Sequence, residues 1–311
     1  METFDLGIAW DSEFDNEFVN DLNDRALKEG VKPYLIHVYN FFSSLKDITD
    51  SQLTFRCFFD RSSDDSSTFG GLADFLKKKD INFINHPDNV KNSIDKSKIH
   101  SMFISYGLPV PKTVFLKPQE EKQVLEAKIQ HVSVPCMLKS AFGSCSEGTA
   151  LVINSLDDAL RLMGQEEDKS YFAQEQVSPI NLENKPAWFK VLYCFGEIIL
   201  CRWHPVDKEY DALSLKQIYR LGLHEIWPIT KKIKQACRLD FFSTDIAMKD
   251  KGKFLVVDYV NDRPDMRKKS KFKDALPDEI VDKVINSIVS FVKKPIKKDG
   301  SQSVRSKSGQ G

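Results

Sequence analysis

The chain has 311 residues, of which 41% are apolar, and its 45 Lys and Arg balance its 45 Asp and Glu to a formal net charge of +0. This composition is typical of a folded protein, and the balanced charge argues against nucleic acid as a partner, because such a partner needs a basic surface. No apolar run reaches the roughly 20 residues that a membrane helix needs, so we expect no membrane partner either.

The cysteines and histidines predict neither a disulfide framework nor a zinc site. The six cysteines are Cys57, Cys136, Cys145, Cys194, Cys201 and Cys237. None belongs to a CxxC pair and four lie within apolar runs, which is typical of buried, reduced thiols in a cytoplasmic protein. His224-Glu225 begins like a HExxH zinc motif, but Pro228 stands where the second His is required.

Residues 1–90 alternate between apolar runs and segments with helical spacing. The apolar runs predict buried strands at 4–10, 34–38, 53–59 and 81–84. Helical spacing predicts helices at 14–28, which Gly30 closes, and at 72–79. This alternation predicts an N-terminal α/β domain with a parallel sheet covered by helices.

Residues 91–170 predict a small central α+β unit. We expect one helix at 93–106, with Ser93 as its cap and Gly107 at its end. A second helix at 120–129, strands at 136–139 and 149–153, and a helix that begins at Ser155 complete the unit.

Residues 171–296 predict a C-terminal α+β domain. A strand at 171–177, a hairpin of 188–195 with 197–203, a helix at 225–238, a second hairpin of 241–248 with 253–260, and a helix at 280–292 follow one another. The last residues, 297–311, are mostly Ser, Lys and Gly, and we expect them to be a disordered tail.

Three polar features lie at the ends of predicted strands or at the start of a predicted helix. Lys139 ends a strand before a loop of small residues, 140–148, and such a Lys can hold phosphate oxygens while backbone N–H groups cover them. Lys96 opens a helix, and Gln174-Glu175 ends a strand where it could contact an adenine edge. Taken one at a time, these features fit equally well a solvated Lys, an ordinary loop and a strand that leaves the core.

Oxygen ligands gather on the second predicted hairpin. Asp245 lies in its first strand, and Asp258 and Asn261 lie at the end of its second strand. A lone Asp in an apolar strand is costly unless it has a partner, and here two lie on adjacent strands. Two carboxylates and an amide oxygen are ligands that suit Mg²⁺ bridging nucleotide phosphates.

The order of these motifs resembles the ATP-grasp superfamily over about residues 85–265. The motifs are Lys96 with its helix, Gly107-x-Pro109-x-Pro111, Pro135-x-x-x-Lys139, the small-residue loop, Gln174-Glu175, Asp245, and the strand that ends at Asn261 before Pro264. The resemblance implies an ATP-grasp fold, with an N-terminal parallel α/β domain, a small central lid and a C-terminal α+β domain, and it implies ATP and Mg²⁺ as cofactors.

The same resemblance implies a role for each matching residue. Cofactor contacts are expected from Lys96, Lys139, Ser144, Ser146, Gly148, Glu175 and Val177; metal ligation from Asp245, Asp258 and Asn261; and catalytic roles from Lys190 and Arg263. Lys190 would stabilise the transferring phosphoryl group.

One departure concerns the metal strand. ATP-grasp proteins usually end this strand with an acid, one residue and Asn, but here Tyr259 stands at the acid position and Asp258 lies one residue further away. Because successive side chains of a strand point to opposite faces, either a β-bulge corrects the spacing or Asp262 replaces Asp258.

The favoured function is that of an ATP-dependent carboxylate–amine ligase similar to glutathione synthetase and the ribosomal-protein glutamate ligases, which act through an acyl phosphate. The substrate is expected to be an anionic small molecule or peptide. Its pocket is expected between Lys190, Arg202 and the basic segment 263–273. The sequence does not predict the oligomeric state.

Two alternatives remain open from the sequence. A kinase of the inositol polyphosphate kinase type is suggested by Phe189-Lys190-Val191 and by Leu239-Asp240-Phe241-Phe242 before Asp245, although the neutral net charge argues against a polyphosphate substrate. A non-catalytic nucleotide-binding protein is the other alternative, and its only support is the departure at Tyr259.

Overall fold

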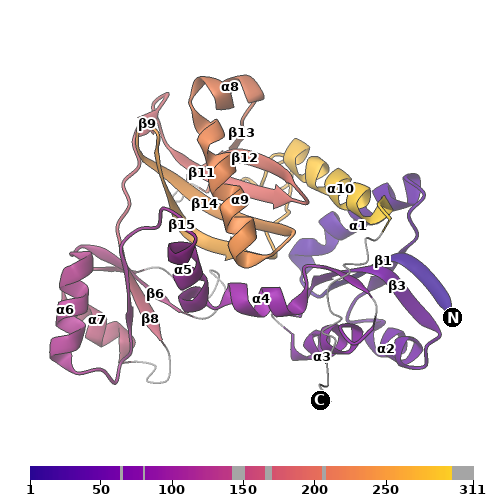
Figure 1. Cartoon of the computed structure of the whole chain (residues 1–311). Coiled ribbons are helices and arrows are strands. Elements are labelled where there is room, and N and C mark those ends of the chain that lie inside the picture. Colours follow the sequence, from indigo (N-terminus) through magenta and orange to yellow (C-terminus); the bar gives the residue numbers. More distant parts are fainter. Residues whose placement is uncertain (64–65, 80, 142–150, 165–169, 205–207, 296–311) are drawn as a thin grey trace, which may run out of the picture.

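The computed structural model describes residues 1–63, 66–79, 81–141, 151–164, 170–204 and 208–295. Three sheets of four or five strands organise them into an N-terminal, a central and a C-terminal unit (Figure 1). The predicted disordered tail, 297–311, lies outside the described residues. The domain boundaries at 90/91 and 170/171 stay a prediction, but the central sheet continues to Glu175 because its strand β8 (Tyr171–Glu175) lies beyond residue 170.

The N-terminal unit has the predicted parallel sheet, with strand order β2-β1-β3-β4. Its strands are β1 (Glu2–Trp10), β2 (Pro33–Ile36), β3 (Leu53–Arg61) and β4 (Asn82–Ile84), and its helices are η1 (Glu13–Asp15), α1 (Asn16–Lys28), α2 (Phe41–Thr49) and α3 (Ser67–Leu76). One face of β1 packs on α1 through Leu6 and Ile8, while Gly7 faces the other core. A Cβ at Gly7 would lie 2.8 Å from the Phe55 ring, so this strand position needs glycine.

Two helices occupy the place of the single helix predicted at 93–106. They are α4 (Pro87–Ile94) and α5 (Lys96–Ser105), and Asp95 separates them. The predicted cap at Ser93 is wrong: Ser93 is buried inside α4 and donates to the carbonyl of Asn89 at 2.8 Å. Asp95 Oδ1 instead accepts the backbone N–H groups of Ser97 and Lys98, each at 3.1 Å, and so caps α5.

The central unit is an antiparallel sheet of order β5-β8-β6-β7 with two helices on one face. Besides β8, its elements are β5 (Thr113–Leu116), α6 (Lys122–Val132), β6 (Cys136–Ser140), β7 (Leu151–Ile153) and α7 (Leu156–Met163). Leu138 and Ala173 point toward the helices. Lys139 and Gln174, one position further along each strand, therefore point away from them.

The C-terminal unit is a five-stranded antiparallel sheet of order β13-β12-β11-β14-β15. Its elements are β9 (Asn181–Leu182), β10 (Lys185–Pro186), β11 (Trp188–Cys194), β12 (Glu197–Trp203), β13 (Tyr210–Ala212), α8 (Leu215–Arg220), η2 (Leu223–Glu225), α9 (Ile226–Cys237), β14 (Phe241–Asp250), β15 (Lys253–Asn261) and α10 (Asp278–Lys293). Both hairpins predicted from the sequence are confirmed, β11 with β12 and β14 with β15.

The two faces of this sheet have different neighbours. Phe189, Phe242 and Val256 belong to the core beneath α9 and α5. Leu192 and Cys201, on the opposite face, pack against α10, which in turn lies beside α1 (Figure 1). Helix α10 thus joins the C-terminal and N-terminal units through one shared core. None of the described helices is long and apolar enough to cross a bilayer.

Candidate functional site

The pairing of β14 with β15 decides which polar side chains share a face. Asp245 lies opposite Asp258, and Ser243 lies opposite Asn261, so β15 has one more residue than β14 between the two pairs. This is a β-bulge, the first of the two ways in which the spacing at Tyr259 could be corrected. Because opposed residues share a face, and because Ser243 and Asp245 are two residues apart, Asp245, Asp258 and Asn261 lie on one face.

Lys190 lies on this face as well. It is opposite Asp245 in the pairing of β11 with β14, and its Nζ lies 2.6 Å from Asp245 Oδ1. The side chains of Lys190 and Asp245 are only 18% and 8% exposed. We call the face that carries Lys190, Asp245, Asp258 and Asn261 the site face.

Burial and neighbouring charges shift the pKa values of Asp245 and Asp258 in opposite directions. Burial raises the pKa of Asp245, and the negative charge of Asp258 raises it further, against the opposing effect of Lys190. Burial also acts to raise the pKa of Asp258, but the charges of Lys139, Lys190 and Lys96 outweigh it, so that this pKa lies below its usual value. These carboxyl groups and lysines therefore form one electrostatic cluster.

Lys139 and Lys96 approach the cluster from the central unit and from α5. Lys139 Nζ lies 3.5 Å from Gln174 Oε1 and 5.8 Å from the centre of the Phe172 ring. Lys96 Nζ donates to the carbonyl of Ser140 at 3.4 Å. Lys139 on the outer face of the central sheet and Lys96 at the start of α5 thus lie near enough to the site face for their charges to lower the pKa of Asp258.

The remaining predicted cofactor contacts are spread over two segments. Glu175 ends β8, where its backbone N–H donates to the carbonyl of Lys112 at 2.9 Å, and Lys249 Nζ lies 3.7 Å from its Oε1. Val177 is buried two residues later. Ser144, Ser146 and Gly148 lie outside the described residues.

Tyr259 is part of the core behind the site face. Its hydroxyl lies 2.9 Å from His100 Nδ1, and its ring contacts Phe103 and Phe172. Burial raises the pKa of Tyr259 and lowers that of His100. An apolar ring therefore replaces an acid at this position because the bulge has turned Asp258 to the site face instead.

Arg202 does not line the expected substrate pocket. It is opposite Phe189, one residue from Lys190, and so lies on the other face of the sheet. Its guanidinium donates to the carbonyl of Leu182 at 2.7 Å and to Glu183 at 3.3 Å. The sequence-based placement of Arg202 beside Lys190 is therefore wrong, and the pairing around Gly196 is the reason.

Most of the basic segment 263–273 is engaged with acids. Arg267 pairs with Asp265 at 2.7 Å and Asp274 at 3.3 Å, Lys268 with Asp21 at 2.7 Å and Asp282 at 3.0 Å, Lys271 with Glu17 at 2.9 Å, and Lys273 with Glu209 at 3.3 Å. Several of these acids come from α1 and α10. The segment thus ties the C-terminal unit to the N-terminal unit.

Arg263 directly contacts Asn261 of the site face. Its backbone N–H donates to Asn261 Oδ1 at 3.0 Å, and its Nη1 donates to the carbonyl of Arg61 at 2.8 Å. Arg61 is itself buried, paired with Asp15 at 2.6 Å and bonded to the carbonyl of Pro264 at 3.0 Å. These contacts fix the chain just after Asn261 against the end of β3, and nothing in the sequence pattern singled out Arg61.

Aromatic side chains next to Lys190 were also missed from the sequence. Lys190 Nζ lies 5.0 Å from the centre of the Trp203 ring, which contacts Trp188 and Tyr210. Burial raises the pKa of Tyr210 to about 12, so its hydroxyl is neutral near pH 7. The sequence did contain the information for this contact, because a hairpin that turns at Gly196 places Trp188 opposite Trp203.

The described residues contain no group of three or more His, Cys, Asp or Glu side chains that could hold a metal ion. The predicted set consists of two carboxylates, Asp245 and Asp258, with the amide of Asn261. An amide oxygen has a second lone pair besides the one that accepts the N–H of Arg263. Two carboxylates and an amide oxygen on one face are ligands that a hard divalent cation takes, so these residues fit such a cation.

Comparison with known proteins gives matches among solved structures. No protein-family model and no curated protein matches the sequence. Solved structures do match: a RimK-domain ATP-grasp protein from Sphaerobacter thermophilus is 13% identical with a TM-score of 0.64, over 93% of this chain and 99% of that one.

Two further structures match over a similar length. The D-alanine–D-alanine ligase of Bacillus anthracis, complexed with ATP, is 13% identical with a TM-score of 0.65, over 92% of this chain and 96% of that one. The ATP-grasp ligase PsnB, complexed with a minimal precursor, Mg and ADP, is 16% identical with a TM-score of 0.62, over 91% of this chain and 98% of that one. The chain therefore has the ATP-grasp fold that the order of its motifs predicted.

Proposed function

We propose that this protein uses ATP and Mg²⁺ to join a carboxylate to an amine. The observation that carries the proposal is the site face, where Asp245, Asp258 and Asn261 lie together, opposed by Lys139 and Lys96. The named ATP-grasp neighbours are ligases or RimK-domain proteins, which supports ligation as the reaction class.

Each part of the site has a task in this proposal. Lys96 and Lys139 hold nucleotide phosphates, with Ser144, Ser146 and Gly148 as further contacts, and Glu175 and Val177 hold the adenine. Asp245, Asp258 and Asn261 hold Mg²⁺, which when bound supplies positive charge to the phosphate oxygens. Lys190 and Arg263 stabilise charge on the transferring phosphoryl group and orient the carboxylate substrate.

The proposed reaction has two balanced steps. A carboxylate oxygen of the substrate attacks the terminal phosphorus of ATP, and the bond to ADP breaks, which leaves an acyl phosphate. The amine then attacks the acyl carbon, phosphate leaves, and the amine loses a proton. The contribution of the protein is to position the reactants and neutralise charge.

Ligation is favoured over phosphorylation of an inositol polyphosphate by the state of the basic segment 263–273. A polyphosphate needs several converging cations, but Arg267, Lys268, Lys271 and Lys273 are each paired with acids of this chain. An anionic small molecule or peptide with one or two carboxylates needs fewer cations. Lys190 and Arg263 suffice for such a substrate.

Hydroxylamine trapping tests the proposal. The protein is incubated with ATP, Mg²⁺, hydroxylamine and a panel of amino acids, peptides and inositol phosphates, and both ADP and hydroxamate are measured. We expect a hydroxamate from at least one carboxylate, loss of that product in Asp245→Asn, and its retention in Lys122→Ala, which alters an exposed residue of α6. A stable phosphorylated inositol phosphate, with no hydroxamate from any carboxylate, would contradict ligation.

A further inference from the structure

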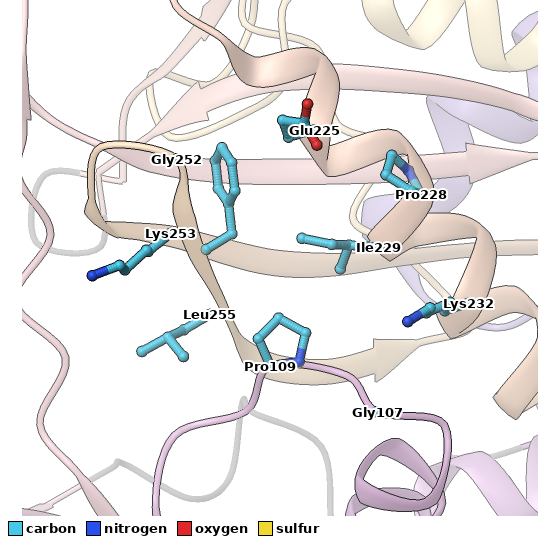
Figure 2. A pocket seen from close by; sticks show the side chains of 10 residues that line it. Gly107, Pro109, Glu225, Pro228, Ile229, Lys232, Gly252, Lys253 and Leu255 are labelled. Carbon is cyan, nitrogen blue, oxygen red and sulfur yellow. The ribbon is translucent and has the colours of Figure 1, made fainter.

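A cavity of about 540 Å³ lies beside the beginning of β15 (Figure 2). Helix α9, the beginning of β15 and the turn that follows α5 line it, and it is open to solvent. Its apolar walls come from Pro109, Pro228, Ile229, Phe254 and Leu255. This volume is within the roughly 300–1,000 Å³ that is common for small-molecule sites.

Helix α9 carries a stripe of residues beside its core-facing side that lines the cavity. Ile226, Ile233 and Ala236 pack on the sheet and are fully buried. Pro228 and Lys232 are exposed and line the cavity together with Ile229, which also packs against the core; the spacings of one, three and four residues place them along one side of the helix. Apolar surface on α9 is therefore divided between the core and the cavity.

The cavity is separate from the candidate functional site. Val256 belongs to the core beneath α9, and its backbone N–H donates to the carbonyl of Pro109 at 2.7 Å. Asp258 lies beyond the irregular pairing that follows Val256 and faces the other way, toward Asp245. A ligand in the cavity would thus contact the first residues of β15, whereas a ligand on the site face would contact Asp258 and Asn261 near the end of that strand.

Lys232 is the cation that the cavity offers. Figure 2 shows its ammonium group directed into the space between Ile229 and Pro109, whereas the ammonium of Lys253 points outward. Within the described residues Lys253 pairs with Asp250 at 3.2 Å, and the side chain of Lys232 makes no hydrogen bond or ion pair. Glu225, at the other end of the stripe, lies 3.4 Å from the ring nitrogen of its neighbour His224.

We propose that this cavity binds a small molecule that has an apolar body and a single carboxylate. The apolar body packs against Pro228, Ile229 and Leu255, where its burial removes apolar surface of both partners from water. The carboxylate accepts a charge-assisted hydrogen bond from Lys232 Nζ. A second anionic group is disfavoured because Glu225 stands at the opposite end of the cavity.

Fluorine NMR with para-trifluoromethylbenzoate tests the proposal on the full chain without nucleotide. We expect saturable binding with a Kd of roughly millimolar strength or tighter. The isosteric para-trifluoromethylbenzamide, which lacks the negative charge, is expected to bind about tenfold more weakly. Lys232→Met should weaken the benzoate by about the same factor, and Ile229→Trp, which fills the cavity, should weaken benzoate and benzamide alike.

Two control variants locate the binding. Lys231→Met removes a neighbouring exposed cation of α9 that does not line the cavity, and it should leave the Kd within about twofold. Lys139→Ala alters the candidate functional site and should likewise leave it unchanged. Equal affinity in Lys232→Met and wild type, loss of binding in Lys139→Ala, or no saturable binding of the benzoate to the wild type would overturn the proposal.

Discussion

The site face and the exposed end of the basic segment 263–273 both contain lysines paired with carboxylates, but they differ in burial. On the site face, Lys190 and Asp245 are 18% and 8% exposed, and the charge of Asp258 raises the pKa of both. At the exposed end of the basic segment, Lys271 and Lys273 are 61% and 86% exposed, and each has one acid as its partner. The same residue types thus form a compact cluster in one place and separate surface pairs in the other.

The density of charged residues along the sequence therefore does not locate a binding site. Six cations between Arg263 and Lys273 suggested a binding site for an anion, yet Lys268 and Lys271 pair with acids of α1 and α10, and Lys269 donates to the carbonyl of Tyr210 in β13. The site face shows only isolated charges in apolar strands. Their burial makes each charge costly without a partner, and it also makes the cluster responsive to a ligand.

The largest effect is expected from Lys190→Met. This change leaves the buried Asp245 carboxylate without its ion-pair partner, which should lower the free energy of unfolding by on the order of 3 kcal/mol. Urea unfolding followed by circular dichroism measures the loss.

A second variant separates the charge effect from lost packing. In Lys190→Met/Asp245→Leu both members of the pair become apolar, so stability should return to within about 1 kcal/mol of the wild type. Full stability in Lys190→Met alone would mean that breaking the buried pair costs no more free energy than breaking a surface pair. The contrast in burial between the site face and the exposed pairs would then have no effect on stability.

A smaller effect, on binding, is expected from Lys139→Ala. Loss of one charge-assisted contact to phosphate should weaken the binding of ADP with Mg²⁺ by about 1.5–3 kcal/mol, which isothermal titration calorimetry can measure. Lys122→Ala, on the helical side of the same central unit, is the matched control and should bind normally. Unchanged affinity in a folded Lys139→Ala protein would remove Lys139 from the proposed site.

The parts of this site that sequence predicted are those in which one local pattern decides the structure. Turns at Gly196 and at Asp250-Lys251-Gly252 predicted both hairpins, and apolar strands around Asp245 predicted a buried carboxylate. The β-bulge was one of two alternatives, because a strand pattern alone does not reveal where an extra residue is accommodated. Only the pairing with β14 shows that Asp258 shares a face with Asp245.

The parts that sequence did not predict depend on distant segments. Lys268 meets Asp21 from α1 and Asp282 from α10, and Arg61 meets Pro264, more than 200 residues further along the chain. No periodicity within 263–273 contains this information. Arg202 is a different case, since counting back from Gly196 would have placed it opposite Phe189 and therefore away from Lys190.

Lys268→Met tests the joining role of the basic segment. Lys268 is 15% exposed and bridges Asp21 and Asp282, so its loss should cost about 1 kcal/mol of unfolding free energy, more than an exposed pair but less than Lys190. Arg25→Met, which removes a single hydrogen bond from α1 to Asn286 of α10, is a matched control with a smaller expected loss. The two values come from parallel urea titrations, and an equal loss would argue against a bridge at Lys268.

The smallest effect is expected from Lys271→Ala combined with Lys273→Ala. These side chains are 61% and 86% exposed, their pairs with Glu17 and Glu209 lie in water, and dissolved salt screens such pairs. The double variant should therefore lose no more than about 0.5 kcal/mol of stability at low salt and less at high salt. Its KM for the carboxylate substrate found by hydroxylamine trapping should equal that of the wild type, because neither lysine is proposed to contact substrate. A raised KM with unchanged stability would mean that Lys271 or Lys273 contacts the anionic substrate. The exposed end of the basic segment would then belong to the substrate site and not only to the contacts that join the two units.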